Sequence, residues 1–398
     1  MKILFINTVF GKGSTGRIVA QLGRAVEQAG GEYKVAYGRG PVSDDPHAHR
    51  ICGPLNILAH VAWTRLTDRL GFFSRHATNK LIALIRDYQP DIIHLHNLHG
   101  YYLHVGKLFA FLKAEYTGKL VWTLHDCWAF TGHCTHFTCA KCDKWQTACS
   151  RCPEKRRYPA SLFVDASARN FRDKKASFCG VNHMTIVTVS EWLKREAQRS
   201  FLGEYPVVRI YNGIDCEKFA PVLTDVRATY GIPTDKRLVL CVSDGWDERK
   251  GFDRLLCVAD KAPADWFFVC VGLTRDQIGI LPDNILGLER IWNQPDLIAL
   301  YAAADVFFNP SLEETFGLVT AEAMACGTPA VVMDSTACPE LIVSPDAGVV
   351  VPTDADTDTM VAAIERAMPL EGAREAALHF TEQANIDAHM AIYGNIQR

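Results

Sequence analysis

The sequence predicts an α/β protein with two domains, each built on a parallel sheet that helices cover on both faces. Short β-rich runs alternate with segments that carry apolar residues at helical spacing, and this alternation stops and restarts once along the chain. The β-rich runs are almost wholly apolar, which is typical of parallel strands buried on both faces. A length of 398 residues exceeds one ordinary core and suits two Rossmann-like domains of similar size.

The strand-like runs fall into two groups. The first group is KILFIN, EYKVAYG, PDIIHLHN, KLVWTLHD and MTIVTVS, and the second, after VVRIYNGID, is RLVLCVSD, WFFVCVG, VFFNPS, PAVVMD and AGVVVP. We therefore expect an N-terminal domain over 1–203 and a C-terminal domain over 204–374. The remaining segment, about 375–398, is predicted as helix and could pack back on the first domain. In such domains ligands bind at the carboxyl ends of the strands.

Composition and charge narrow the class of protein. Hydrophobic residues make up 48% and charged residues 22%, as in globular proteins. The first apolar run is short and ends in Gly and Lys, unlike a signal peptide, and no apolar stretch is long enough to span a membrane. We expect a cytoplasmic protein with free thiols and no nucleic-acid partner. Residues 1–200 are strongly basic and residues 201–398 strongly acidic. The basic half could meet a phospholipid surface or a pyrophosphate-linked ligand, or the two halves could attract each other.

The most informative stretch is NPSLEETFGLVTAEAMACGTPA, residues 309–330. A strand ends in a loop, and a helix begins near Gly317 and stops before a second glycine and a proline. Backbone N–H groups at such a helix start suit a diphosphate or sugar hydroxyls. Glu314 precedes the helix and Glu322 follows about two turns along it, and a carboxylate is well suited to grip two vicinal hydroxyls.

Glu314-x7-Glu322 within this stretch resembles the signature of the family-4 retaining glycosyltransferases, which have the GT-B fold. Further blocks resemble that family in the same order over nearly the whole chain: DIIHLHN, LVWTLHD, TVSEWLKRE, IYNGIDCEKF, ERKGFDRLL and LIALYAAADVFF. The resemblance implies an N-terminal acceptor domain and a C-terminal domain that binds a nucleotide-sugar donor. By the same resemblance, Glu322 binds the ribose, and Glu314 with the amides of Phe316, Gly317 and Leu318 holds the donor sugar and phosphate.

The resemblance also implies a basic pair that neutralises the diphosphate. Lys250 in DERKG matches its lysine, but the partner arginine would fall near Asp244 or Gly245 and is absent. Arg249 or Arg254 could replace it, because a guanidinium suits phosphate. The alternative for Lys250 is a solvated residue at a helix start.

Two features of the first domain point to the same chemistry. The turn GKGSTG at 11–16, with Gly13, lacks the acidic residue of a dinucleotide site, so an NAD-dependent role is disfavoured. By itself it is a tight turn, and in the resembling family this loop forms a second wall for phosphates or acceptor. His125, at the end of a strand in TLHD, matches the histidine that lies beside the reacting sugar, with a satisfied cleft histidine as the alternative.

Three further histidines form the cluster HLHNLH. No carboxylate lies within reach of them along the sequence, so we interpret them as structural or acceptor-facing rather than as metal ligands: His94, His96 and His99.

Six cysteines crowd between 127 and 152. Cys139-x2-Cys142 and Cys149-x2-Cys152 have the spacing of a four-thiolate zinc site, and His133 and His136 are nearby. Similar insertions occur in the family's colanic-acid and capsule subgroup, and that pattern implies a structural zinc ligated by four thiols, with Cys139 as a possible replacement: Cys134, Cys142, Cys149 and Cys152. The alternatives are loose thiols or disulfides. The insertion is expected over about 126–160.

Residues 54–80 carry apolar residues at helical spacing together with four basic residues. They could form an interfacial helix on anionic lipid, or a helix that packs on its own sheet with a basic outer face, which we favour.

The leading hypothesis is a retaining transferase of surface-polysaccharide assembly (O-antigen, capsule or exopolysaccharide). Its donor would be a UDP- or GDP-sugar, and its acceptor an oligosaccharide or an undecaprenyl-pyrophosphate-linked sugar, reached by peripheral contact with the inner membrane face. No cofactor is expected for catalysis. The alternatives are a nucleotide-sugar epimerase and a nucleotide-sugar-binding protein without catalysis.

Overall fold

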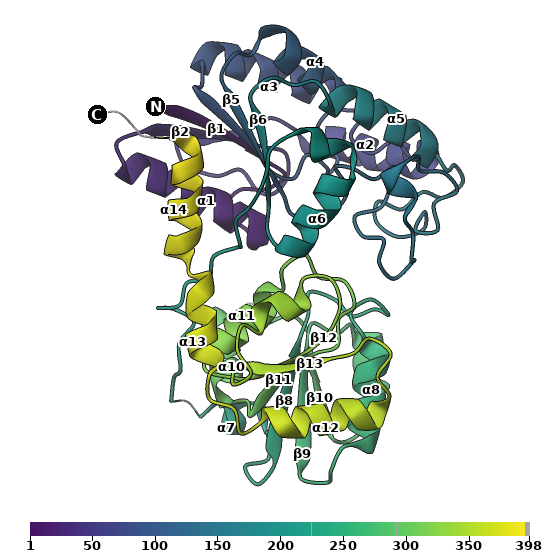
Figure 1. Cartoon of the computed structure of the whole chain (residues 1–398), viewed down its shortest axis with the longest axis vertical. Coiled ribbons are helices and arrows are strands. Elements are labelled where there is room, and N and C mark those ends of the chain that lie inside the picture. The colour runs from purple at the N-terminus through teal and green to yellow at the C-terminus, as the bar shows by residue number, and fades with distance from the viewer. Residues whose placement is uncertain (224, 292, 395–398) are drawn as a thin grey trace. The chain divides into compact units, whose positions relative to one another are not determined.

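The computed structural model of the protein describes residues 1–223, 225–291 and 293–394. The chain forms two compact units (Figure 1). One contains Met1–Tyr211 and the chain from Ile386 on, and the other contains Asn212–Asn385.

The first unit has a seven-stranded parallel sheet in the order β3-β2-β1-β4-β5-β6-β7. Its strands are β1 Lys2–Asn7, β2 Glu32–Tyr37, β3 Ala48–Arg50, β4 Ile92–Leu95, β5 Lys119–Leu124, β6 Met184–Thr188 and β7 Val207–Arg209. Its helices are α1 Gly13–Gln28, α2 Pro54–Thr67, α3 Arg75–Tyr88, α4 Val105–Glu115, α5 Ser167–Phe178 and α6 Glu191–Arg199. Short 3₁₀ turns lie at Lys144–Gln146 and Phe201–Glu204.

The second unit has a six-stranded parallel sheet in the order β10-β9-β8-β11-β12-β13. Its strands are β8 Arg237–Val242, β9 Trp266–Val271, β10 Ile285–Leu288, β11 Val306–Asn309, β12 Ala330–Met333 and β13 Gly348–Val351. Its helices are α7 Val226–Tyr230, α8 Phe252–Lys261, α9 Arg275–Ile278, α10 Gln294–Ala303, α11 Leu318–Ala325, α12 Thr357–Ala367 and α13 Ala373–Ala377, with 3₁₀ turns at Cys338–Leu341 and Leu378–Phe380.

The predicted parallel sheets are confirmed, and their burial explains why the strands are so apolar. All of β1 after Lys2 is buried, and Ile3 and Phe5 pack in one core with the inward face of α1. The second core is built in the same way, with Val239 of β8 against Leu255 of α8. Because both faces of each sheet are covered, alternation with polar residues would bury unsatisfied groups.

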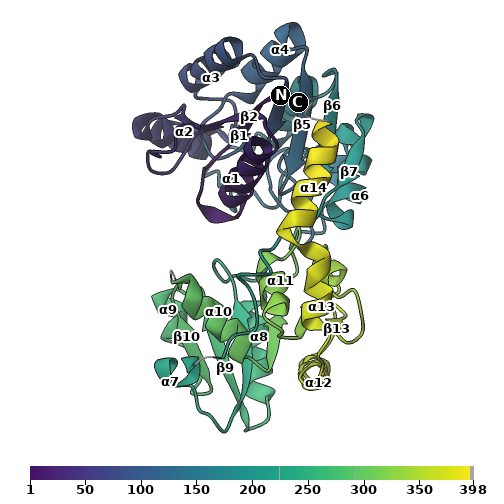
Figure 2. The same cartoon turned by 90° about the vertical axis from the view of Figure 1, so that its left-hand side faces the viewer.

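The last helix, α14 Glu382–Tyr393, ends on the first sheet. Tyr393 is buried in the core around β1, and its hydroxyl lies 2.6 Å from Nδ1 of His94 in β4. The first strand and the end of the last helix thus both lie in the first unit (Figure 2).

Each sheet reverses its strand order once, between β1 and β4 in the first unit and between β8 and β11 in the second. Loops that leave the carboxyl ends of strands at such a reversal diverge to opposite faces and leave room for a ligand. Of the predicted site residues, Gly13 follows β1, Arg249 and Lys250 follow β8, and Glu314 follows β11, whereas His125 follows β5, the neighbour of β4.

Candidate functional site

In the second unit, the loop after β8 and the loop after β11 are bonded to each other. The N–H of Leu312 donates to the carbonyl of Arg249 at 2.7 Å, and Ser311 Oγ donates to the same carbonyl at 3.4 Å. Gly251 has a φ of +76°, and a Cβ there would lie 2.4 Å from the carbonyl oxygen of Pro310. A glycine is therefore required for this close approach, which brings Lys250 to the start of the second loop.

Lys250 and Glu314, two predicted donor-site residues, form an ion pair. Nζ of Lys250 lies 2.6 Å from Oε1 of Glu314, and both side chains are mostly buried, with 26% and 16% exposed. The backbone N–H of Glu314 donates to Thr336 Oγ1 at 3.0 Å, which fixes this loop against the loop after β12. The two loops thus place a cation and a carboxylate together at a partly buried position.

Glu322 lies on α11 in a separate polar contact. Its side chain is buried, and Oε2 accepts a hydrogen bond from the hydroxyl of Tyr301 on α10 at 3.3 Å. Burial, and the carboxylate of Glu322, raise the pKa of Tyr301 well above its ordinary value, so this hydroxyl stays a donor. The structure thus holds the second glutamate of the motif in a fixed orientation.

The predicted helix start is present at Gly317. This residue is the N-cap of α11 with a φ of +99°, and its carbonyl accepts the N–H groups of Thr320 and Ala321. Phe316 is buried and its ring packs against Phe380 at 5.6 Å. The backbone of Phe316, Gly317 and Leu318 is therefore held by packing on one side and by the first turn of α11 on the other.

Near Asp244, where this chain lacks the arginine of the family's basic pair, an exposed arginine from another loop forms an ion pair. Arg290, which follows β10, places Nη1 2.9 Å from Oδ1 of Asp244. Sequence reasoning missed it, because it enters from a different loop. Of the replacements predicted, Arg249 is paired with Asp247 at 3.1 Å and with Glu313 at 3.6 Å.

In the first unit, Asn7 and Thr8 connect the loops after β1 and β4. Asn7 Oδ1 accepts the N–H of Asn97 at 3.3 Å, and Thr8 Oγ1 donates to the carbonyl of Asn97 at 3.0 Å. Gly13 opens α1 with a φ of +65°, and a Cβ there would face open space. The glycine-rich turn is thus exposed at the reversal of strand order.

His125 lies at the end of β5 beside the end of β4. Its Nε2 is 3.0 Å from Nδ1 of His96, and the two rings stack at 5.4 Å. Burial lowers the pKa of His125 to about 4, so the ring is uncharged at neutral pH. It can donate or accept a hydrogen bond but supplies no positive charge. His94 is structural: its nitrogens contact Tyr393 and Thr123.

His99 contacts a carboxylate that is distant from it along the sequence. Nε2 of His99 lies 2.7 Å from Oδ2 of Asp126, and Nδ1 lies 3.2 Å from the hydroxyl of Tyr158. Burial favours the protonated acid, but the charge and contact of His99, with the N–H of Trp128, lower the pKa of Asp126 to about 2. A tyrosine, a histidine and a carboxylate thus lie in series at the strand ends of this unit.

The structure does not support the predicted zinc site. Among residues 1–223, 225–291 and 293–394, no three or more His, Cys, Asp or Glu side chains are arranged to hold a metal ion. Cys134 instead donates a hydrogen bond to Cys152, which lowers the pKa of Cys152, and burial raises the pKa of Cys149 to about 11. The sulfur of Cys149 accepts the N–H of Gly132 at 3.2 Å.

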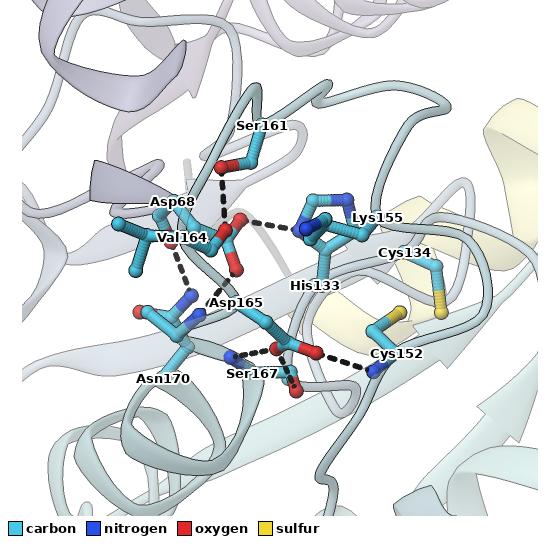
Figure 3. A network of polar contacts seen from close by, with 12 residues as sticks. Asp68, His133, Cys134, Cys152, Lys155, Ser161, Val164, Asp165, Ser167 and Asn170 are labelled. Carbon is cyan, nitrogen blue, oxygen red and sulfur yellow. Dashed lines mark hydrogen bonds and ion pairs between the residues drawn. The ribbon is translucent and has the colours of Figure 1, made fainter. Parts of the chain in front are cut away.

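Other contacts fix the cysteine-rich insertion. The Trp145 ring is buried against Phe137 at 4.7 Å and Phe130 at 5.2 Å. His133, considered above as a metal ligand, is hydrogen-bonded to the buried carboxylate of Asp68, which raises the pKa of His133 against the effect of its burial (Figure 3). An aromatic cluster and a buried ion pair thus hold the segment.

Lys174 on α5 is a buried basic residue that contacts the backbone of the cysteine-rich insertion. The side chain is buried, and Nζ donates to the carbonyls of Trp128 at 2.6 Å and Thr131 at 3.0 Å. Burial lowers the pKa of Lys174 to about 7. Between this value and its ordinary pKa the unfolded chain binds more protons, so the Lys174 contribution to the free energy of unfolding rises with pH.

We predict that wild type gains stability over Lys174→Met by about 1.4 kcal/mol per pH unit between pH 7.5 and 9. Urea unfolding of both proteins across this range measures the difference, in which the titrations of groups distant from Lys174 cancel. A difference that is flat with pH would show that Lys174 keeps an ordinary pKa.

Two family models match consecutive parts of the chain. The model for Glycosyltransferase Family 4 matches residues 15–218, more than half of the sequence, and the model for glycosyl transferases group 1 matches residues 224–386. The chain belongs to Glycosyltransferase Family 4. The first model includes His125 and begins just after Gly13, and the second includes Lys250, Glu314 and Glu322.

Individual relatives agree with this assignment. The chain is 25% identical over 364 residues to a protein named for colanic acid biosynthesis, the glycosyl transferase WcaC of Escherichia coli (strain K12), covering 86% of this chain and 85% of that one. It is 31% identical over 202 residues, 46% of each chain, to the D-inositol 3-phosphate glycosyltransferase of Mycolicibacterium smegmatis.

Solved structures show the fold. The sucrose-phosphate synthase of Thermosynechococcus elongatus has a TM-score of 0.73 at 21% identity over 98% of both chains. WaaG, a glycosyltransferase of lipopolysaccharide biosynthesis, has a TM-score of 0.63 at 15% identity over 98% of this chain and 99% of that one. The predicted GT-B fold of two Rossmann-like units is thereby confirmed. In the part of the chain that the structure describes, no helix has the length and apolar character needed to cross a bilayer.

Proposed function

We propose that the protein is a retaining glycosyltransferase that moves a sugar from a UDP- or GDP-sugar to an oligosaccharide or lipid-linked oligosaccharide acceptor in surface-polysaccharide assembly. The observation that carries the proposal is the ion pair of Lys250 with Glu314 at the reversal of strand order in the second sheet. A cation and a hydroxyl-binding carboxylate at one sheet edge suit a phosphorylated sugar. The relative named for colanic acid biosynthesis supports the choice of pathway class.

The donor would bind in the second unit. Glu322 would accept hydrogen bonds from the ribose hydroxyls, and Glu314 with the backbone from Phe316 to Leu318 would hold the sugar. Lys250 would leave Glu314 and neutralise the diphosphate, with Arg290 or Arg249 as the second cation. A solved structure of Anabaena HepE with UDP and glucose has the same fold, with a TM-score of 0.65 at 16% identity over 98% of this chain and 99% of that one.

In the reaction, the bond from the anomeric carbon to the diphosphate breaks while the acceptor oxygen bonds to the same face of that carbon. The acceptor hydroxyl gives its proton to the departing diphosphate, so the products are a glycoside of retained configuration and a nucleoside diphosphate. The protein stabilises the charge that develops on the leaving group, from Lys250 and the arginines. Neutral His125 would donate or accept a hydrogen bond with a donor hydroxyl.

Thermal unfolding with a panel of UDP- and GDP-sugars tests the donor. We expect one nucleotide sugar to raise the melting temperature, because a ligand at about 100 times its Kd adds about 2.7 kcal/mol of stability. Release of free nucleoside diphosphate that depends on an added acceptor then separates transfer from binding alone. Conversion of the donor to another nucleotide sugar without acceptor would instead identify an epimerase.

A further inference from the structure

Helix α2 presents its apolar side to solvent and its polar side to the protein. Its buried residues are His60 and Thr64. Leu55, Leu58 and Leu66, which share one stripe at helical spacing, are 83%, 66% and 45% exposed. Within α2 this reverses the usual amphipathic arrangement. The segment 54–80 forms α2 and the start of α3, and part of the expected basic outer face is present, because Arg65, Arg75 and Lys80 are exposed.

Hydrogen bonds fix this orientation. Nδ1 of His60 lies 2.8 Å from Ser74 Oγ, and its Nε2 accepts the N–H of Gly71 at 3.3 Å. Burial lowers the pKa of His60 to about 3, so the ring is neutral and its Nε2 can accept the N–H of Gly71. Rolling the helix to bury its leucines would break these contacts, so the exposed stripe is built into the fold.

A second apolar segment lies beside the end of α2. Leu162, Phe163 and Val164 are 57%, 74% and 45% exposed. The N–H of Leu162 donates to the carbonyl of Arg65 at 2.8 Å, which joins the loop to the helix.

Hydrogen bonds to its backbone fix the loop that carries these three residues. Ser161 Oγ donates to the carbonyl of Val164 at 2.6 Å, and Asp165 Oδ2 accepts the N–H of Cys152 at 2.6 Å (Figure 3). Lys155 Nζ donates to the carbonyl of Phe163 at 3.2 Å. These contacts use the backbone and leave the apolar side chains outward.

Positive charge lies next to these apolar segments. A hollow of about 620 Å³ begins where α2 ends, and its walls include Thr67, Phe73, Arg69, Arg75 and Arg169. The ring of Trp63, which is 54% exposed, stacks on Phe73 at 6.4 Å and so links the apolar stripe to the hollow. The acidic side chain in this wall, Asp173, is shared by Arg69 at 2.7 Å and Arg169 at 3.6 Å.

We propose that these segments form a docking face for an anionic lipid bilayer: Leu55, Leu58, Trp63, Leu66, Leu162, Phe163 and Val164. The apolar side chains would enter the boundary between headgroups and acyl chains, and the arginine-lined hollow would take lipid phosphates. A second copy of the chain fits less well, because a two-fold contact through this face would bring the arginines of both copies together. The proposal rests on the proposed function in one respect, that the acceptor is lipid-linked.

The docking face is joined to the strand ends of the first unit. Tyr158 belongs to the same connection between β5 and α5 as Phe163. Its hydroxyl lies 3.2 Å from Nδ1 of His99, which in turn contacts Asp126. An acceptor whose lipid stays in the bilayer would therefore approach the site over Tyr158.

Co-sedimentation of the full chain with vesicles tests the docking face. We expect binding to vesicles of phosphatidylcholine with phosphatidylglycerol, and weak binding to phosphatidylcholine alone. Leu162→Ser with Phe163→Ser should weaken binding at least about tenfold, since each buried apolar side chain contributes about 1.5–3 kcal/mol. Arg75→Glu with Arg169→Glu should abolish the preference for the anionic lipid. Ile280→Ser is the matched control, because Ile280 is 66% exposed in the second unit.

Three outcomes would overturn the proposal: no binding to either vesicle, equal binding by the Leu162 and Phe163 variant, or a wild-type dimer in sedimentation velocity that these substitutions convert to monomer. Stabilisation by the nucleotide sugar is measured on the same variants. If it is retained while vesicle binding is lost, the docking face is separated from the donor site. If donor binding fails in wild type but vesicle binding holds, only the proposed function is contradicted.

Discussion

Replacing Glu322 by alanine should abolish donor binding while the protein stays folded. In the proposed complex this carboxylate accepts hydrogen bonds from two ribose hydroxyls, and a hydrogen bond to a charged group contributes about 1.5–3 kcal/mol, so Kd should rise at least about 100-fold. The side chain is buried and its Oε2 accepts the Tyr301 hydroxyl at 3.3 Å, which restricts the orientation of the carboxylate. Calorimetric titration with the nucleotide sugar found by the thermal panel measures the change.

Two variants show whether the effect belongs to the site. Glu365→Ala removes a carboxylate from α12 in the same unit, where its side chain is 59% exposed, and should bind donor like wild type. Tyr301→Phe removes the partner of Glu322 and should weaken binding less than Glu322→Ala does. Normal donor binding by Glu322→Ala would make Glu322 a structural partner of Tyr301 and refute its assigned role.

The fold could be predicted because its signals are local. A strand buried on both faces must be apolar along its length, as in β1 or β8, and the helix that begins at Gly317 is marked by its own glycine. The loop residues Lys250 and Glu314 could be named as candidates, but their ion pair spans the gap between β8 and β11, which only the strand order brings together.

What the sequence could not supply were contacts between separate loops and the direction of a helix face. Asp126 reaches His99 because β4 and β5 are neighbours in the sheet, and Arg290 reaches Asp244 from the loop after β10. The cysteine spacing suggested zinc, but spacing alone does not fix the distances and directions that the ligands of a metal ion need. Helical periodicity located α2 but could not decide that His60 points inward and Leu58 outward, because that choice depends on Ser74 and Gly71.

Lys250→Ala should lower kcat/KM by about 10²–10³-fold, as expected when one preorganised stabiliser of a leaving group is removed. The fall in kcat/KM should be larger than the loss of the attraction between Lys250 and the diphosphate alone would cause. Without Lys250, the carboxylate of Glu314, which now lies 2.6 Å from Nζ, would face an anionic donor uncompensated. Acceptor-dependent release of nucleoside diphosphate measures the rate, and donor affinity is measured in parallel.

The unpaired charge that Glu314 would carry without Lys250 predicts how donor affinity differs between the single and double variants. Lys250→Ala with Glu314→Gln should bind donor more tightly than Lys250→Ala alone, because the second change removes the unpaired charge while it keeps the shape of the side chain. Glu314→Gln alone should bind the diphosphate at least as well as wild type, since Lys250 is then freed from its competitor, yet transfer more slowly if Glu314 holds the sugar. Independent, additive losses in the double variant would mean that the two residues do not share a ligand, and would remove the ion pair as the basis of the donor site.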